Sequence, residues 1–140
     1  MAVLLDTSVW SLALRRSPKH LDTLQSAIVG DIAELVRNRQ VRLIAPIRQE
    51  LLTGIREPGQ FGRLRAYLRA FPDAALSPQD YEGAAAAANQ CIAAGIAVHN
   101  VDLLICAVSI NRRWEIYTTD GDFLQYSRRL PIRLRQPQRR

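Results

Sequence analysis

The chain has 140 residues, with two cysteines and two histidines, and its 19 basic and 13 acidic residues give a formal net charge of +6. This length suits about one domain that buries roughly two-thirds of the surface of the extended chain, so a core can form without disulfides. The widely spaced histidines and the lack of a Cys-x-x-Cys pair argue against a structural zinc site, and the sequence has no nucleophile elbow, P-loop or dinucleotide-binding glycine motif.

The first predicted element is a short apolar run that ends at a carboxylate. Val3 to Leu5 are apolar at consecutive positions, which is typical of a strand buried on both faces of a parallel sheet. Asp6 follows at the strand end, where open α/β sheets bind ligands. A helix cap at Asp6, Thr7 or Ser8 is the commoner use of such residues, so this position alone leaves both interpretations open. Asp6 also interrupts the only apolar run near the amino terminus, and we therefore predict no signal peptide.

Two helices and a strand are predicted next. A helix after Trp10 is expected to end at Ser17–Pro18, and apolar residues at helical spacing predict a second helix over residues 21–39. Residues 41–45 predict a second short strand.

A third helix, which Pro46 can start, carries Glu50 in its early part. An acid at this position suits the helix dipole, which would explain it without a function. Glu57–Pro58–Gly59 is expected to end this segment, before an amphipathic helix over residues 61–71. Residues 74–76 are a candidate short strand.

An alanine-rich helix follows. Ser77 as the N-cap and Asp80 in the first turn predict its start, and Gly95 is suited to stop it after Ala94. Its small side chains allow a neighbouring helix to approach closely. The stretch is too short and too polar to span a membrane, and we expect a cytoplasmic protein with no membrane association.

The next helix is apolar with one acid. Residues 101–108 are apolar nearly all round except for Asp102, which predicts a largely buried helix. A lone carboxylate at the start of such a helix must cap backbone groups, be paired or bind a cation. Cys91 and Cys106 lie in apolar helical surroundings and are expected to be buried thiols rather than a disulfide.

Residues 115–118 predict a strand that leads into an acidic turn. Asp120–Gly121 alone is typical of a turn. Asp120 and Asp122 around a glycine at a strand end are also what a metal site needs. A last strand over residues 130–134 is expected at a sheet edge because of Pro131.

The positive charge is concentrated at the carboxyl end. Residues 128–140 hold six arginines and no acid, and removing these six from the 19 basic residues leaves 13, which the 13 acids balance. A basic end favours a polyanion such as nucleic acid. The alternative, a solvated terminus in an arginine-rich proteome, stays open. If the segment binds RNA, the candidate contacts are Arg128, Arg129, Arg133 and Arg135.

Four acids share one kind of position, at strand ends or helix starts on one rim of the predicted sheet. Carboxylates gathered in one pocket repel and raise each other's pKa, whereas a divalent cation among them keeps them ionised. Ligands that are all oxygen select Mg²⁺ or Mn²⁺ rather than zinc. Such a site can activate water and neutralise a phosphoryl oxygen, so phosphodiester hydrolysis is its natural chemistry. The four residues are Asp6, Glu50, Asp102 and Asp120.

Four short motifs carry these acids in order along almost the whole chain. They are Leu5-Asp6-Thr7-Ser8-Val9, Glu50-Leu51, Asp102-Leu103-Leu104-Ile105-Cys106-Ala107 and Tyr117-Thr118-Thr119-Asp120-Gly121-Asp122-Phe123. Each motif is weak alone, while four in this order at this length are fairly specific. Together they resemble the PIN domain family, and within it the VapC-type toxins of prokaryotic toxin–antitoxin pairs. Cys106 departs from the alanine that such sequences usually have, which should not affect catalysis.

The resemblance implies a three-layer α/β/α sandwich with a central, mainly parallel sheet. We expect a single PIN-like nuclease domain over residues 1–135 and a basic, disordered tail over residues 136–140. The implied activity is that of an endoribonuclease that uses Mg²⁺, with Mn²⁺ as an alternative. A VapB-like antitoxin whose tail enters the acidic pocket is the implied inhibitor, and a homodimer is a family expectation.

Carried over by position, the resemblance assigns roles to seven residues. Asp6 and Asp102 would lie nearest the first metal ion, and Asp122 would be an extra ligand or a water-orienting group. Thr7 and Thr118 would supply supporting hydroxyls. The stretch from His20 to Gly30 is longer than the family pattern suggests, which leaves the local access to the site open. The complete acidic catalytic set is Asp6, Glu50, Asp102 and Asp120.

Two other functions stay open at this point. One is a PIN nuclease that processes RNA without an antitoxin, and a neighbouring gene for a small DNA-binding partner would argue against it. The other is a non-catalytic interaction module in which the acids serve as helix caps and docking charges. Such a module should show no acid-dependent binding of Mg²⁺ or Mn²⁺.

Overall fold

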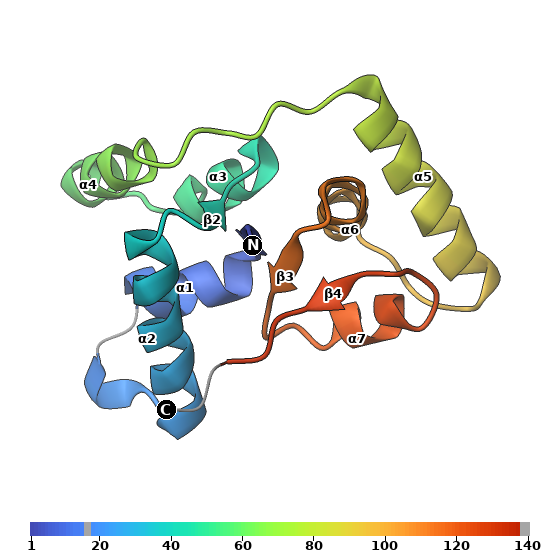
Figure 1. The fold of residues 1–140 in the computed structure, drawn as a ribbon. Helices are drawn as coiled ribbons and strands as arrows, with labels where there is room; N and C mark the ends of the chain where they lie inside the picture. The colour runs from blue at the N-terminus through green and yellow to red at the C-terminus, as the bar shows by residue number, and fades with distance from the viewer. Residues whose placement is uncertain (16–17, 138–140) are drawn as a thin grey trace.

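The structure is a computed structural model, and it describes residues 1–15 and 18–137. Its strands are β1 (Val3–Leu5), β2 (Val41–Arg42), β3 (Glu115–Tyr117) and β4 (Arg133–Leu134). They form one sheet in the order β2-β1-β3-β4, in which all neighbouring strands are parallel (Figure 1). All carboxyl ends of the strands therefore lie at the same edge of the sheet.

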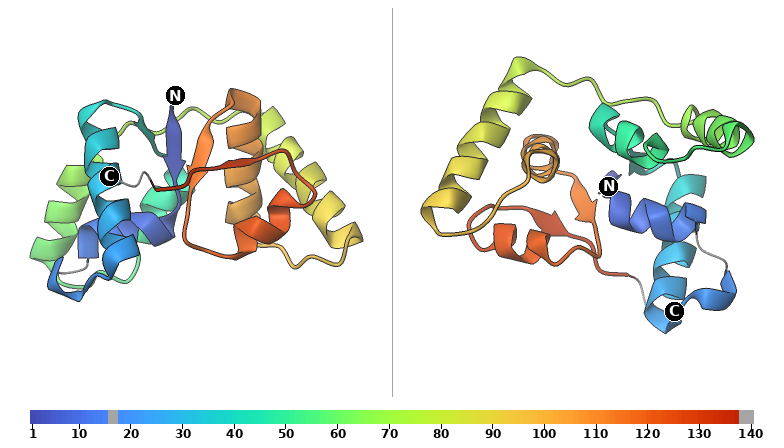
Figure 2. Two further views of the ribbon diagram at one scale, coloured as in Figure 1. Left: turned by 60° about the horizontal axis from the view of Figure 1, so that its bottom comes forward. Right: turned by 180° about the vertical axis from the view of Figure 1, so that it is seen from behind.

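Helices cover both sides of this sheet. They are α1 (Thr7–Arg15), the 3₁₀ helix η1 (Pro18–His20), α2 (Thr23–Arg37), α3 (Ala45–Leu52), α4 (Pro58–Leu68), α5 (Pro78–Ala93), α6 (Asn100–Arg112) and α7 (Asp122–Ser127). α3 and α6 lie on one side of the sheet and α1 and α2 on the other, while α5 packs outside α6 (Figures 1 and 2). The predicted α/β sandwich with a parallel central sheet is confirmed.

The core follows from the apolar runs that predicted the central elements. The three residues of β1 are fully buried, because helices cover both faces of the strand. Residues 103–108 of α6 are buried as well, as expected for a helix that is apolar nearly all round. Each such leucine, isoleucine or valine contributes about 1.5–3 kcal/mol on burial. The free thiols of Cys91 and Cys106 are buried, as predicted.

Several helix ends lie where the capping residues predicted them. The Ser77 N–H donates to Asp80 Oδ2 at 2.9 Å at the start of α5. Gly95, with a φ of +78°, follows its end in the left-handed region that favours glycine. At α2, the Gln25 N–H donates to the Asp22 carboxylate at 2.7 Å, so this helix begins after Asp22.

Other predicted elements are wrong or shorter. Residues 74–76 form no strand, and only an isolated bridge joins Leu43 to Asp73. The second strand ends at Arg42 because α3 already begins at Ala45. Glu57–Pro58–Gly59 starts a helix, since the Glu57 carboxylate accepts the N–H groups of the next turn. The last strand covers Arg133–Leu134 only, although it does lie at the sheet edge.

Two predictions concern the chain as a whole. Of the tail expected over residues 136–140, residues 138–140 lie outside the described part of the chain. Among the described helices, none is both long and apolar enough to cross a membrane.

Candidate metal centre and active site

Asp6 lies directly after β1 and is held by hydroxyl groups. Its side chain is nearly buried, and its Oδ2 accepts hydrogen bonds from Ser8 Oγ and Thr118 Oγ1, both at 2.8 Å. The Asp6 N–H donates to the Tyr117 carbonyl at 2.9 Å, which continues the β1–β3 pairing past the strand end. The carboxylate is therefore oriented by neutral donors, not by an arginine or lysine.

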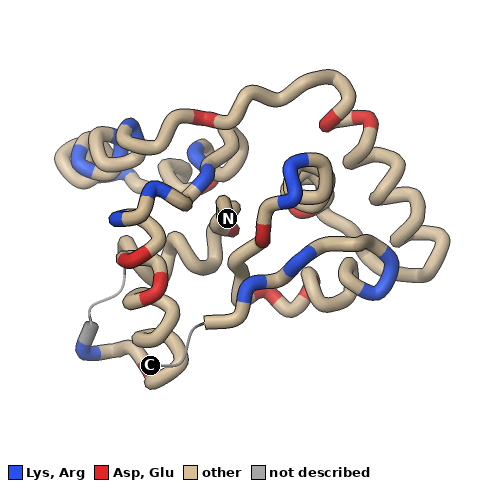
Figure 3. The backbone as a smooth tube through the Cα atoms, in the orientation of Figure 1, with Lys and Arg blue, Asp and Glu red and all other residues tan. Residues whose placement is uncertain are grey.

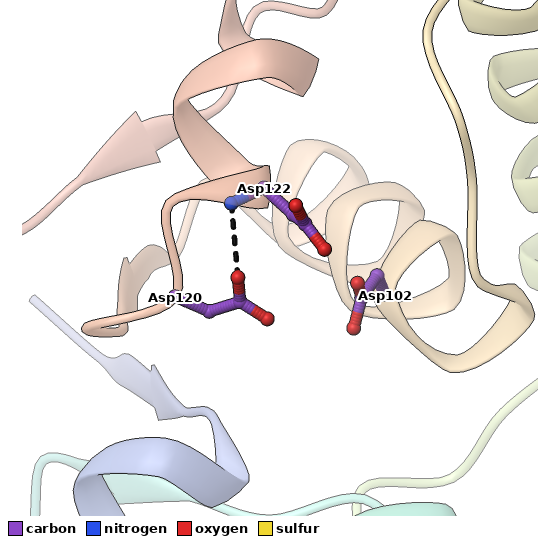
Figure 4. Close-up of side chains that lie close together, drawn as sticks. All are labelled: Asp102, Asp120 and Asp122. Atoms are coloured by element: carbon purple, nitrogen blue, oxygen red, sulfur yellow. Dashed lines mark hydrogen bonds between the residues drawn. The ribbon is translucent and has the colours of Figure 1, made fainter.

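The same hydroxyls organise the loop after β3. The Thr119 N–H donates to Ser8 Oγ and the Asp120 N–H donates to Thr118 Oγ1, each at 3.0 Å. The Asp122 N–H then donates to Asp120 Oδ1 at 2.9 Å, which is the dashed line in Figure 4. Residues more than 100 positions apart in the chain are joined here because β1 and β3 are parallel neighbours that end at the same edge.

Asp102 reaches this edge from the first turn of α6. The fully buried Tyr126 donates its hydroxyl to Asp102 Oδ2 at 2.9 Å. Burial is the main cause that raises the pKa of Asp102 to about 6. The charges of Asp6 and Asp120 raise this pKa further, while the Tyr126 hydrogen bond and His99 lower it. The local field at Asp102 thus disfavours a carboxylate that has no cation beside it.

Three aspartates converge at this place and form what we call the carboxylate cluster. Asp102, Asp120 and Asp122 each offer an oxygen, and these oxygens lie within 4.8 Å of one another. Figure 4 shows their side chains directed toward a common space from α6, from the loop after β3 and from the start of α7. An all-carboxylate donor set of this kind fits a hard divalent cation such as Mg²⁺ or Mn²⁺.

Glu50 is near the carboxylate cluster but is not one of its members. Thr7 donates its hydroxyl to Glu50 Oε2 at 2.7 Å, so α1 and α3 are linked beside Asp6. Glu50 is exposed and lines a separate hollow together with Val101, the neighbour of Asp102 in the chain. Each of the two threonines named from the sequence donates a hydrogen bond to a carboxylate: Thr7 to Glu50 and Thr118 to Asp6.

For three polar residues of the site, the sequence predicted no role in the site. Ser8 belongs to the same motif as Asp6, two positions later. This closeness in sequence was the only signal that Ser8 bonds the Asp6 carboxylate. His99 precedes α6, and its Nε2 lies 3.8 Å from Asp122 Oδ2. Tyr126 belongs to α7, a helix of six residues that was itself not predicted. No sequence pattern indicates that its hydroxyl meets Asp102.

The four arginines predicted to contact RNA differ in their surroundings. Arg128, Arg129 and Arg133 are exposed. Arg135 instead donates to Asp31 Oδ2 at 3.0 Å and to Glu115 Oε1 at 3.1 Å, with its side chain only 14% exposed. Its guanidinium is thus engaged inside the fold.

A groove of about 340 Å³ adjoins the carboxylate cluster. Thr118, Asp120 and Gly121 form its wall on the side of the cluster. Leu24 and Leu124, both large apolar side chains that are mostly exposed, also line it. The site therefore combines negative charge with an apolar surface beside it.

Solved structures similar to this one include FitAcB and two VapBC proteins. FitAcB from Neisseria gonorrhoeae matches with a TM-score of 0.75 and 19% identity, over 96% of this chain and 97% of that chain. VapBC2 from Rickettsia felis, bound to a DNA fragment from its promoter, matches with a TM-score of 0.74 and 18% identity, over 96% of this chain and 98% of that one. VapBC-1 from nontypeable Haemophilus influenzae matches with a TM-score of 0.72 and 18% identity, over 97% of this chain and 98% of that chain. At such identities the likeness is one of fold.

A comparison at the level of sequence families is more direct. No curated protein matches the sequence significantly. The family model described as the PIN domain, however, matches residues 3–129, which include β1, the start of α6 and the acidic loop after β3. The chain belongs to the PIN domain family.

Proposed function

We propose that the protein is a VapC-like endoribonuclease toxin that requires a divalent cation and is neutralised by a VapB-like antitoxin. The observation that carries this proposal is the carboxylate cluster, whose oxygens lie within 4.8 Å of one another beside the buried Asp6. Membership in the PIN domain family supports it. A fold shared with VapBC and FitAB complexes supports the toxin assignment.

The acids of the site would bind the divalent cation together. Asp102, Asp120 and Asp122 would hold Mg²⁺ or Mn²⁺, with Asp6 beside them and Glu50 at the rim. A bound cation supplies Lewis-acid chemistry, because it polarises a phosphoryl oxygen and activates water. Tyr126 engages one oxygen of Asp102 and leaves the other free for a ligand.

Hydroxyl groups keep the remaining acids in place. Ser8 and Thr118 both donate to Asp6 Oδ2, which leaves Oδ1 of this carboxylate to face the site. Thr7 does the same for one oxygen of Glu50. Oriented carboxylates lose less conformational freedom when they take up a cation, so such support favours binding.

The proposed partners follow from the charged and apolar surfaces of the domain. The exposed Arg128, Arg129 and Arg133 supply positive charge for RNA phosphates. An antitoxin segment with an apolar side chain and a basic group would fit the groove, where Leu24 and Leu124 lie beside the negative carboxylate cluster. Both partners of such a toxin would be met in the cytoplasm.

A homodimer is also part of the proposal. Tyr81 and Ile92 of α5 are 54% and 57% exposed, and a second copy would cover such apolar side chains. Sedimentation of the purified chain tests this: a monomer at micromolar concentration would contradict it.

The decisive experiment substitutes Asp102 by Asn, which has nearly the same shape. We expect Asp102→Asn to lower Mg²⁺-dependent RNA cleavage by about 100-fold or more, because the cluster loses a charged ligand. Glu82→Gln, an exposed change on α5, is the matched control with normal activity. Cleavage at the wild-type rate by purified Asp102→Asn would refute the assignment, as would cleavage that persists in EDTA.

A further inference from the structure

A second pocket, with a mainly apolar lining, lies between the C-terminal end of α6 and β4. It has a volume of about 200 Å³, and two exposed arginines contribute to its walls. We call it the arginine pocket; it is lined by Ser109, Ile110, Arg113, Trp114, Pro131, Ile132 and Arg133.

The arginine pocket lies at the opposite end of the domain from the carboxylate cluster. α6 has 13 residues, with Asp102 in its first turn and Arg113 just after its last residue. At a rise of about 1.5 Å per residue, Asp102 and Arg113 are roughly 17 Å apart along the helix. In the sheet, Arg133 pairs with Glu115 at the beginning of β3, whereas Asp120 follows the end of that strand.

The groups in the arginine pocket suit a phosphate. Ser109 is 1% exposed, and its hydroxyl has no hydrogen-bond partner among the described residues. Arg113 and Arg133 add two guanidinium groups, which donate in the fork geometry that matches phosphate oxygens. The acid nearest in register, Glu115, is already bonded to Arg135 at 3.1 Å. A buried donor without an acceptor, together with two exposed cations, indicates an anionic ligand.

Further positive charge surrounds the pocket. The guanidinium group of Arg42 lies 5.9 Å from the ring centre of Trp114. That of Arg112 lies 5.5 Å from the same ring but is paired with Asp80, so Arg42 is the one that adds positive charge. Figure 3 shows basic residues on the near end of α6, along β4 and in the segment between α2 and β2. This end of the domain is therefore basic, while the aspartates of the carboxylate cluster occupy the other.

We infer that the arginine pocket binds a backbone phosphate of the substrate RNA, about 17 Å away from the carboxylate cluster along α6. The identity of the ligand as RNA rests on the proposed function. A dinucleotide, which has a single phosphodiester, is too short to reach both sites, while a folded RNA can span them. The pocket would thus favour long or folded RNA over short fragments, without taking part in the chemistry.

The test compares binding and cleavage in two pairs of variants. Arg113→Gln with Arg133→Gln removes the pocket's charges, and Arg65→Gln with Arg69→Gln removes the same charge from α4 as the control. Binding to bulk transfer RNA is measured by fluorescence anisotropy in EDTA, where no cleavage is needed for a signal. We expect the pocket pair to lose about tenfold in affinity and to lower the salt slope by about 1, because one phosphate contact disappears.

Cleavage of a dinucleotide by the pocket pair should equal that of the wild type. Ser109→Ala, which removes the unpartnered hydroxyl, should fold normally and weaken transfer-RNA binding by about two- to threefold. Equal losses in both arginine pairs would overturn the inference, since they would reflect net charge alone. Unchanged binding of transfer RNA by the pocket pair would also overturn the inference. If the pocket pair at the same time binds polyaspartate more weakly than the control pair, the pocket belongs to an acidic protein instead. If no form cleaves RNA, the proposed function fails, whereas the EDTA binding data still decide the pocket.

Discussion

Aspartates that are buried or partly buried occur in two regions of the molecule, and their partners differ. Asp31 and Asp80, each with a side chain only 4% exposed, pair with Arg135 and Arg112. Asp102, in contrast, has a tyrosine hydroxyl and other carboxylates around it. An aspartate whose charge is met by arginine serves the fold, while one whose charge is met only by hydroxyls is available to an external cation.

The pKa values express the same difference. The Arg112 guanidinium holds the pKa of Asp80 well below its usual range, helped by the Ser77 N–H. Burial and neighbouring acids raise the pKa of Asp102 to about 6. The two regions should therefore respond in opposite directions to substitution, to metal ions and to pH.

The largest expected effect is a loss of stability when the buried pair of Asp31 and Arg135 is broken. Asp31→Ala removes the acceptor of Arg135 and of the Tyr117 hydroxyl, which lies 2.9 Å from Asp31. We expect the free energy of unfolding to fall by about 3–5 kcal/mol, because a nearly buried guanidinium loses its main partner. Urea denaturation measures this.

The control for this change is Asp73→Ala. Asp73 pairs with Arg48 at 2.9 Å, but its side chain is 39% exposed, so its loss should cost about 1 kcal/mol or less. Similar costs for both variants would contradict the distinction between buried and exposed pairs.

The next effect concerns the cation. Mg²⁺ or Mn²⁺ at about 100 times its dissociation constant should raise the stability of the wild type by about 2.7 kcal/mol, because it binds the folded state. Asp102→Asn should abolish most of this gain, while Glu82→Gln should keep it. Thermal melting with and without the cation checks the prediction, and an equal gain in all three proteins would contradict it.

The smallest effect is a pH dependence in the absence of metal. The folded pKa of Asp102, about 6, exceeds its ordinary value of 3.8, so between these values the folded chain binds the proton that the unfolded chain releases. This contribution to stability is complete below about pH 3.8 and is lost as the pH rises through about 6. Asp102→Asn should therefore be more stable than the wild type at pH 7, by about 1 kcal/mol after allowance for solvent screening.

Asp80 makes stability change with pH in the opposite direction. Its lowered pKa adds stability above its ordinary value, and this is lost on acidification. Unfolding curves between pH 4 and pH 7 measure this. The fall in the free energy of unfolding that Asp102 causes as the pH rises should appear in the wild type and be absent from Asp102→Asn. A variant that is less stable at pH 7 would show that Asp102 acts as a structural acid, like Asp80.

The sequence allowed the main features of the site to be predicted because they follow local rules. The apolar run before Asp6 and the apolar helix after Asp102 both require burial, and parallel topology then brings the strand ends together. The capping residues of α5 were informative for the same reason, since a cap depends on neighbours within one turn.

What could not be predicted depends on contacts between distant segments. The hydroxyl of Tyr126 meets Asp102 only because α7 folds back beside α6, and α7 is too short for a helical period to show. Arg135 resembled the other basic residues near the carboxyl end, yet its partner Asp31 is 104 positions away. Composition gives the charge of such residues but not their partners.

The β1–β3 pairing has a consequence for synthesis of the protein. Ser8 bonds a residue 110 positions later, and the carboxylate cluster needs Asp120 and Asp122 as well as Asp102. A ribosome-bound nascent chain therefore lacks a complete site until the segment through Asp122 has emerged, because contacts of such long range form late. A fragment that stops before Asp120 would contain β1 and α6 but would hold only one of the three carboxylates of the cluster.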